Sequence, residues 1–471
     1  MGQHITDSGD WAIAAIRTRL VSRAITQLLP AFTCALLAFA APGLNAAEYR
    51  AAELTPPRSV DDIDGTLSNV SNQILFYRGP VVKAIDDWRK SKGPYLRDGH
   101  VQFNFRTMDF RTDIIDITQI NAWAAPGEIA YRSGKWRDFL TVGTSVYGSY
   151  ELSGNENAGG SGMLQLNGDN ITTLGQAYLE FNWKGLVGRA YRQTLDIPYL
   201  NKNDSRMIPN TFEAYGLARE GTSLDFIVGY VDKIKLRNSE DFISMGEAAG
   251  VEGDDTGTRL FGALWKPPET GFDWGVTVQR TPDVLQLVYT EANWKRTYKG
   301  WGLLAAAQYT HQKGIGRDLL GDFKTNARGV RFSTSYRDAV LGVAFTKTDD
   351  GATIDSPFGG RPGYTSSMLR NFDRANEKAL RLSLSYHFDV IGLPDWSANV
   401  RFTKGKDALN DDSLIPLEDT REVDYTLDYK PEGGRWQGLW FRIRYAQLRE
   451  DGAGKISDQL RIILNYSISI L

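Results

Sequence analysis

The chain has 471 residues with 54 basic and 57 acidic side chains, and its formal net charge of -3 gives no indication of nucleic acid binding. A mean hydropathy of -0.35, with no apolar run of about 18 residues beyond the N-terminal region, excludes a helical membrane protein. Composition alone does not separate a membrane β-barrel from an exported periplasmic enzyme.

Residues 1–46 have the pattern of a secretory signal peptide. Three arginines between positions 17 and 23 precede an Ala- and Leu-rich apolar stretch, and residues 44–46 offer a small-residue cleavage site. The only cysteine, Cys34, lies inside the apolar stretch, so the mature chain is expected to contain no disulfide.

Residues 47–99 show no regular alternation of apolar and polar side chains, although 80–92 could form a short helix. This segment is expected to be either a periplasmic extension or a piece of chain held inside the lumen. The remainder, 100–471, is predicted to be one all-β domain.

Strand periodicity begins near residue 100. In the segment 380–388, every second residue is apolar or aromatic and the intervening ones are polar. The same alternation occurs at 101–106, 330–336, 423–429, 439–445 and 460–470. Such strands have one apolar and one polar face. If the apolar face contacts lipid, the polar face must line a hydrated lumen; a soluble barrel would require the opposite assignment.

The connections between these strands alternate between two lengths. Long polar connections are expected at 154–171, 195–210, 237–256, 313–326, 349–375, 406–420 and 450–458. Short ones alternate with them at 183–185, 220–222, 267–271, 296–300, 337–338, 391–394 and 431–434. The hairpin at 281–283 is a short exception within the long set. Outer-membrane barrels combine short periplasmic turns with long outer loops, so this pattern predicts a membrane-spanning antiparallel barrel of about 18 strands. A barrel of that size encloses an aqueous channel.

Aromatic residues gather beside the short turns. They are Trp183, Trp265, Trp274, Trp294, Tyr298, Trp301, Trp396, Trp436 and Trp440. Amphipathic rings favour the boundary between lipid and water, so we expect them to form an interfacial girdle. The alternative is that they pack a soluble core.

The phase of each strand predicts which charges face the lumen. Inward arginines are expected at Arg106, Arg331, Arg381, Arg401, Arg442, Arg444 and Arg461. Guanidinium groups bind carboxylates through a planar fork of donors, and a series of sites with moderate affinity lets an anion pass from one to the next. The alternative is that these arginines pair with lumen acids such as Asp424 and Asp428.

The most specific local sequence is 188–212, GRAYRQTLDIPYLNKNDSRMIPNTF. It resembles the third-loop signature of the outer-membrane porin D (OprD) family. Further resemblance lies at 376–378, 392–394, 441–445 and 461–471, and coverage extends from about residue 100 to the C-terminus.

This resemblance implies an eighteen-stranded, substrate-selective channel in the outer membrane of a Gram-negative cell. Its third and seventh outer loops would fold inward, and its basic ladder would guide carboxylate-bearing solutes. The resemblance assigns the constriction to five third-loop residues, Tyr199, Asn203, Asp204, Ser205 and Arg206, together with the loop 349–375. Asp204 and Arg206 could pair with each other or contact solute. The segment 48–99 and the insertion 237–256 depart from the family pattern.

Catalysis has little support in the sequence. The histidines are scattered, and no Ser/His/Asp group, metal-ligand spacing or phosphate-binding glycine loop is present, so we expect neither an enzyme nor a cofactor. Acidic pairs such as Asp254-Asp255 and Asp411-Asp412 are expected to be solvated, the alternative being divalent cation binding or bridging to lipopolysaccharide.

Three functional classes therefore remain. The preferred one is a porin for selective passive uptake of small anionic or zwitterionic solutes, such as amino acids or aromatic acids. The others are a general diffusion porin without a preferred solute, and a barrel enzyme or soluble hydrolase. The expected surroundings are outer-membrane lipid and lipopolysaccharide, with the protein as a monomer or loose trimer.

Overall fold

The computed structural model describes residues 92–114, 118–411, 413–452 and 456–469, all within one compact unit. The predicted signal peptide and most of the segment 47–99 lie outside the described residues. Within the described ranges, no helix has the length and apolar character to cross a bilayer.

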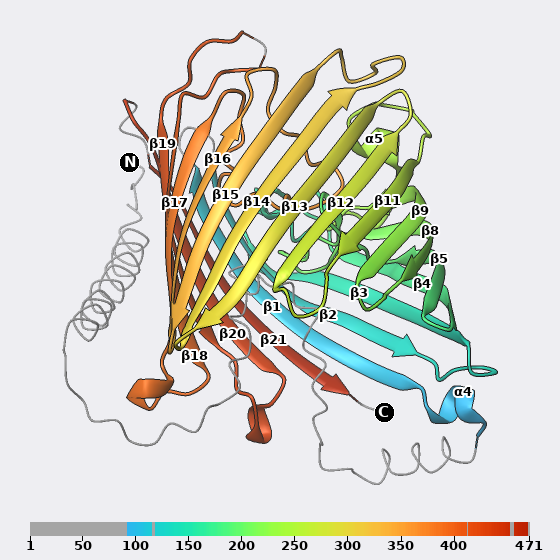
Figure 1. Ribbon diagram of the computed structural model, residues 1–471. Helices are drawn as coiled ribbons and strands as arrows, with labels where there is room; N and C mark the ends of the chain where they lie inside the picture. Colours follow the sequence, from blue (N-terminus) through green and yellow to red (C-terminus); the bar gives the residue numbers. More distant parts are fainter. Residues whose placement is uncertain (1–91, 115–117, 412, 453–455, 470–471) are drawn as a thin grey trace, which may run out of the picture. The chain divides into compact units, whose positions relative to one another are not determined.

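Eighteen antiparallel strands form a closed barrel (Figure 1). The first nine are β1 (His100–Ile114), β2 (Thr118–Arg132), β3 (Leu140–Gly154), β4 (Ile171–Trp183), β5 (Leu186–Gln193), β8 (Thr211–Arg219), β9 (Leu224–Lys235), β11 (Thr258–Trp265) and β12 (Phe272–Thr281). The other nine are β13 (Leu285–Tyr298), β14 (Trp301–Gly314), β15 (Lys324–Tyr336), β16 (Ala339–Thr348), β17 (Lys378–His387), β18 (Trp396–Lys406), β19 (Thr420–Tyr429), β20 (Leu439–Glu450) and β21 (Ile456–Ser469). Pairing of β1 with β21, in register from Gln102 opposite Ser469 to Asp113 opposite Asp458, closes the barrel. The predicted fold class and strand number are confirmed.

Short additional elements lie in the connections. They are the strands β6 (Asp196–Ile197), β7 (Leu200–Asn201) and β10 (Phe242–Ser244), the helices α4 (Pro94–Arg97) and α5 (Met245–Ala248), and the 3-10 turns η2 (Ala158–Ser161), η3 (Asp389–Ile391) and η4 (Gly434–Trp436).

The connections sort to opposite ends of the barrel, as the sequence predicts (Figure 1). Two of the short ones are two-residue turns in which both central residues have positive φ: Lys184 at 49° with Gly185 at 82°, and Lys299 at 48° with Gly300 at 80°. This is the type I′ geometry that matches the twist of paired strands, and it explains glycine at the second position.

The two faces of each strand differ as expected. On β17, Leu380 and Leu382 are 43% and 50% exposed on the outside, whereas Arg381 between them is 7% exposed on the inside. Most girdle aromatics are exposed beside the short turns. Trp440 is not part of the girdle: strand phase turns it inward together with Arg442, and it is buried inside, where its indole Nε1 donates to Asp428 at 2.7 Å.

Two clusters of buried apolar side chains hold outer loops inside the barrel. One joins Tyr199, Leu200 and Phe358 to wall residues of β8, β9 and β13. The other joins Met163 of the connection 155–170 and Met207 of the connection 194–210 to wall residues of β1–β4. The interior is therefore narrowed by packed chain rather than by isolated side chains.

Candidate functional site

The connection between β5 and β8, here called loop 3 (residues 194–210), is anchored to the wall by Tyr199. The Tyr199 ring is 2% exposed and meets the Tyr289 ring edge-on at 5.9 Å, and its hydroxyl lies 2.8 Å from the Thr310 hydroxyl. Tyr199 is thus an attachment point. The sequence analysis assigned Tyr199 to the constriction, but its side chain is buried between loop 3 and the barrel wall.

Loop 3 is also joined to the connection between β16 and β17, here called loop 7 (residues 349–377). The Asn201 side chain donates to the Gly360 carbonyl at 2.7 Å and accepts from the Gly360 amide at 2.7 Å. The Asn201 amide donates to the Phe358 carbonyl at 3.2 Å. Sequence reasoning did not single out Asn201, because an asparagine in a loop carries no signal for a partner some 160 residues away in the chain.

Asp204 pairs with Arg106 of β1 rather than with Arg206. The two side chains form a bidentate ion pair at 2.6 and 3.1 Å, and Arg106 also donates to the carbonyls of Arg206 and Met207 and to the Asn465 side chain. Arg206 instead donates from Nε to the Ser161 carbonyl of η2 at 2.7 Å. The possibility of mutual pairing raised by the sequence is therefore wrong.

The remaining two predicted loop residues bind an arginine from the next outer loop. Arg237 donates to the Asn203 side chain at 3.3 Å and to the Ser205 hydroxyl at 2.5 Å. Arg237 opens the insertion that the sequence had flagged only as a departure from the family pattern. Its position two residues after the end of β9, at the entrance to the loop, was the only indication in the sequence that it could reach loop 3.

Loop 7 lies against the inner faces of β17–β21. Arg381 donates to the Ser366 carbonyl and to the Ser367 hydroxyl. Glu422 accepts hydrogen bonds from the backbone amides of Leu369 and Arg370 at 2.7 and 3.0 Å. Arg461 donates to the Met368 carbonyl at 3.4 Å. The seventh loop thus enters the barrel, and it uses wall arginines as supports.

Three other predicted ladder arginines lie inside the barrel beside acids or aromatic rings. Arg442 forms an ion pair with Asp428 at 2.6 Å. Arg331 lies 4.6 Å from the Tyr364 ring centroid and 4.0 Å from Glu291. Arg401, 2% exposed, is the register partner of Asp424. For Arg442 the acid-pairing alternative is the one observed.

Four arginines come together where loop 3 approaches β20 and β21: Arg206, Arg237, Arg444 and Arg461. Arg444 and Arg461 are direct register partners on adjacent strands. Burial lowers the pKa of the Arg206 guanidinium well below its usual value, and the charges of Arg461, Arg237 and Arg444 lower it further. We call Arg206, Arg237, Arg444 and Arg461 the arginine cluster. Glu422 and Asp424 lie within electrostatic range of Arg461.

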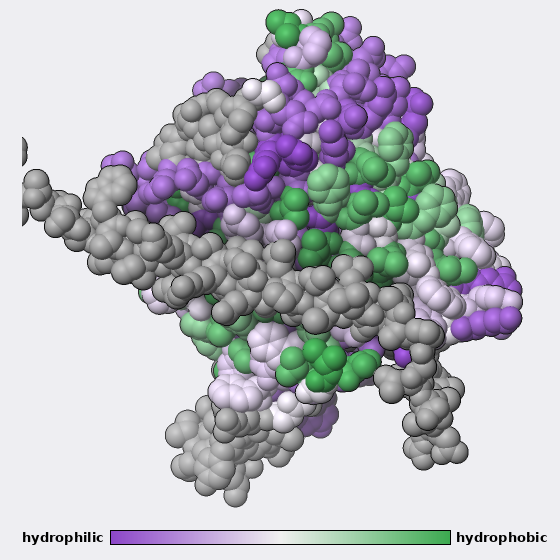
Figure 2. Space-filling model, turned by 90° about the vertical axis from the view of Figure 1, so that its left-hand side faces the viewer, coloured by the Kyte–Doolittle hydropathy of each residue, from purple (hydrophilic) through white to green (hydrophobic). Residues whose placement is uncertain are grey.

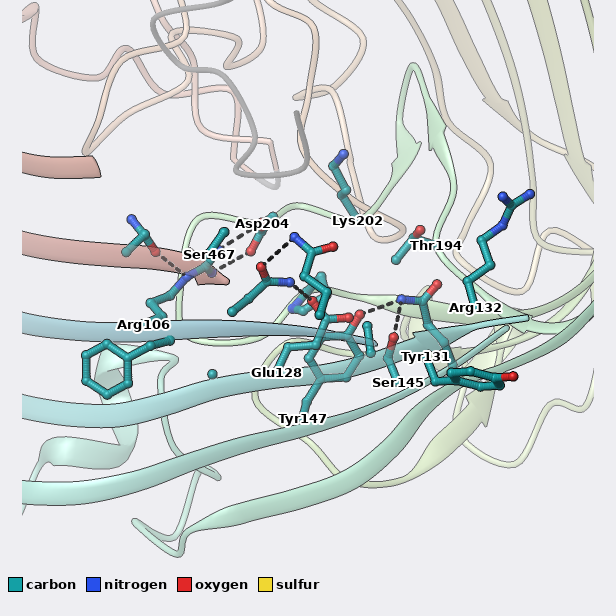
Figure 3. A pocket seen from close by; sticks show the side chains of 18 of the residues that line it. Arg106, Glu128, Tyr131, Arg132, Ser145, Tyr147, Thr194, Lys202, Asp204 and Ser467 are labelled. Carbon is teal, nitrogen blue, oxygen red and sulfur yellow. Dashed lines mark hydrogen bonds and ion pairs between the residues drawn. The ribbon is translucent and has the colours of Figure 1, made fainter. Parts of the chain in front are cut away.

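A chamber of about 530 Å³ lies under loop 3, towards the short-turn end (Figure 3). Thr194, Lys202 and Asp204 line it from loop 3, and the walls come from β1–β4, β20 and β21. Its polar wall includes Glu128, which accepts from Asn104 at 2.7 Å, and Gln176, which donates to the Tyr147 hydroxyl at 2.7 Å. Of the predicted ladder, only Arg106 lines this chamber.

Metal chemistry has no site in the part of the chain that the structure describes: it contains no group of three His, Cys, Asp or Glu side chains arranged to hold a metal ion.

A closed barrel with inward-folded loops and a charged, hollow interior defines an outer-membrane porin. The family model for the outer membrane porin, OprD family, matches residues 93–470. The chain belongs to the OprD family of porins of the Gram-negative outer membrane.

Solved porins share the fold. The chain is similar to OccK9 (OpdG) of Pseudomonas aeruginosa, with 23% identity, 80% of this chain and 100% of that one covered, and a TM-score of 0.73. The chain is also similar to the OpdK structure with vanillate, likewise from P. aeruginosa, with 21% identity, 80% of this chain and 100% of that one covered, and a TM-score of 0.71. A third similar structure is Acinetobacter baumannii OccAB1, with 18% identity, 81% of this chain and 99% of that one covered, and a TM-score of 0.72. No match to a curated protein was found.

Proposed function

We propose that this porin gives selective, passive uptake of small solutes that carry a carboxylate, either aromatic acids or amino acids. The observation that carries the proposal is the arginine cluster. Burial lowers the pKa of the Arg206 guanidinium, and the charges of Arg461, Arg237 and Arg444 lower it further, so four guanidinium groups lie within electrostatic range of one another. A carboxylate entering this space would be attracted by several guanidinium groups at once.

The route from the outer loops to the chamber supports a sequence of sites. Arg461 and Asn465 lie four residues apart on β21, which corresponds to roughly 13 Å along a strand. Asn465 lines the chamber and holds Arg106. A solute would meet the arginine cluster first, then pass the Arg106–Asp204 pair and enter the chamber.

The chamber also suits a second polar group on the solute. Glu128 and Asp204 supply negative charge there, and Gln176, Ser145 and Tyr147 supply uncharged donors and acceptors. An amino group or a ring hydroxyl would find partners on these walls. The vanillate in the OpdK structure is a small aromatic carboxylate of this kind, bound to that relative.

Single-channel recording in planar bilayers tests the proposal. Refolded protein is titrated with benzoate, vanillate, arginine, lysine and glucose, and both current block and reversal potential are measured. We expect anion preference and saturable block by one carboxylate class. Block that stays linear for every solute would mean a general diffusion pore.

A matched pair of arginine variants locates the effect. Arg444→Gln should weaken the saturable block, whereas Arg259→Gln, on the exposed face of β11, should leave it unchanged. Equal block in both variants would remove the arginine cluster from the uptake route.

A further inference from the structure

A row of positive side chains crosses the outside of the barrel at its long-loop end. Arg328 of β15, Lys347 of β16, Lys378 of β17 and Lys406 of β18 are consecutive register partners, each directly opposite the next. Partners in antiparallel strands have Cα atoms about 4.5–5.5 Å apart, so four cations lie side by side. We call these four residues the first row.

A second row continues onto the next strands. Lys404 of β18 is the register partner of Arg421 on β19, and Arg421 is the partner of Arg449 on β20. Lys404 lies two residues from Lys406 on the same face of β18. The two rows together place seven cations across six adjacent strands.

Strand phase puts both rows on the lipid-facing side. Lys347 follows the exposed Phe345 on its face of β16, and Lys378 precedes the exposed Leu380 on β17. Arg421 shares its face of β19 with the exposed Tyr425. The rows therefore border the apolar band at its outer edge. Figure 2 shows hydrophilic residues over the upper part of one side of the molecule and hydrophobic residues gathered below them.

The protein itself neutralises only part of this charge. Among the described residues, the rows form ion pairs with three carboxylates at the loop ends: Asp349 with Arg328, Asp407 with Lys378, and Asp451 with Lys404 and Arg421. Like charges directly opposite each other across paired strands are destabilising, and the rows contain five such pairs. An anionic partner from outside would relieve this repulsion.

The neighbouring wall has the opposite charge at the same level. On β21 and β1, Asp458 and Asp113 are register partners, whereas Asp109 on the same face of β1 is paired with Arg111 at 2.6 Å, so the remaining charge at this level is negative. The positive surface thus ends after β20, which makes it a bounded patch rather than a uniform basic rim.

We propose that the two rows form a binding site for lipopolysaccharide, with the lysine and arginine side chains on the phosphates of lipid A and the apolar band below on its acyl chains. Lipopolysaccharide occupies the outer leaflet, at the end where the long loops lie. Its paired phosphates above several acyl chains match cations spread over several strands directly above exposed Leu, Val and Phe. Arginine and lysine are the side chains that hold phosphate through charge-assisted hydrogen bonds.

Binding of purified diphosphoryl lipid A to the refolded full-length protein tests this site. The dissociation constant is measured in a zwitterionic detergent for the wild-type chain, for the triple variant Lys347→Gln, Lys378→Gln, Lys406→Gln, and for a control triple variant Lys184→Gln, Lys295→Gln, Lys299→Gln. The control removes three exposed lysines at the short-turn end. We expect at least tenfold weaker binding for the first variant and no change for the control. Unchanged binding in the first variant would overturn the proposal.

Two further measurements separate this proposal from alternatives. Dephosphorylated lipid A should bind at least tenfold more weakly, and phosphatidylglycerol should compete poorly; equal competition would assign the patch to anionic phospholipid instead. Heat-modifiable electrophoretic mobility confirms that each variant is folded. Single-channel conductance should be the same in all three proteins, so failure of lipid binding and failure of uptake are distinguishable.

Discussion

Asn201 and Gly360 exchange two hydrogen bonds of 2.7 Å and so join the third and seventh outer loops inside the barrel. Both loops are also held to the wall, through Tyr199 on one and through Ser366 and Ser367 on the other. The narrow part of the channel is therefore one connected body, and its width depends on the contact between these two residues.

Asn201→Ala should loosen this connection without unfolding the barrel. Two hydrogen bonds are lost, at about 1 kcal/mol each, while the eighteen strand pairings remain. We expect a larger and noisier single-channel conductance and weaker solute preference. The measurement is conductance with block by a carboxylate series, and Asn167→Ala, an exposed residue of the second outer loop that bonds Asp169 of the same loop, provides the control. A wild-type conductance would show that the wall contacts alone position the loops.

Gly359→Ala tests the same junction from the other side. A Cβ at this position would lie 2.7 Å from the Asn201 backbone nitrogen, which is too close for the loops to keep their contact. We expect the conductance change of Asn201→Ala, or a larger one, measured in the same bilayer system. Gly433→Ala introduces the same methyl group at a short turn, where the backbone is extended with φ at -154° and a Cβ would meet no atom within 4 Å, and it serves as the control.

Asp204→Asn should destabilise loop 3 through Arg106. The ion pair has side chains only 10% and 9% exposed, so loss of the carboxylate leaves a nearly buried guanidinium without its charge partner, at a cost of about 3 kcal/mol. We expect faster proteolysis within loop 3. Adding Arg106→Gln should restore much of the resistance. A double variant as labile as the single one would mean that Arg106 does not act through Asp204.

Arg442→Gln and Arg444→Gln should have different effects although the residues are two positions apart. Arg442 pairs with Asp428, so its loss should lower thermal stability by about 3 kcal/mol and change affinity little. Arg444 belongs to the arginine cluster, so its loss should weaken carboxylate block about five- to tenfold, the equivalent of about 1–1.4 kcal/mol. Thermal melting and titrated block measure the two effects; identical profiles would contradict the assignment.

Lys235→Met should loosen the contact between the third and fourth outer loops, which Arg237 also joins through Asn203 and Ser205. The Lys235 ammonium is fully buried and donates to the carbonyls of Pro209, Leu236 and Ser239 at 3.2, 3.0 and 3.5 Å. Methionine keeps the volume and leaves these carbonyls without a donor, which costs about 1–3 kcal/mol. Hydrogen exchange at the backbone amides of Asn210 and Arg237 should accelerate, while exchange in β14 should not.

The barrel could be predicted from the sequence because period-two alternation and loop length are both local signals. On β17 the alternation of Leu380, Arg381 and Leu382 fixes the two faces, and the structure has those faces as expected. Strand phase likewise predicted that the ladder arginines face the lumen, and Arg106, Arg331, Arg381, Arg401, Arg442 and Arg461 are buried. The phase of a strand does not depend on how loops fold, so these predictions needed no long-range information.

The partners of those arginines could not be predicted in the same way. Arg106 meets Asp204 and Arg461 meets Met368 through loops that return from distant parts of the sequence. Asn201, Arg237 and the chamber around Glu128 were missed for the same reason. The juxtapositions of Arg442 with Asp428 and of Arg401 with Asp424 did follow from register, since these residues face each other on adjacent strands.

Closure by β1 and β21 has a consequence for biogenesis. The first and last strands of the barrel share twelve register positions, so the ring lacks a complete wall until the end of translation. A chain shortened before β21 would present two open edges of unsatisfied peptide groups to hydrocarbon, an arrangement that bilayers do not tolerate. Nonsense mutations late in the coding sequence should therefore abolish insertion altogether instead of yielding a leaky, partly active conduit.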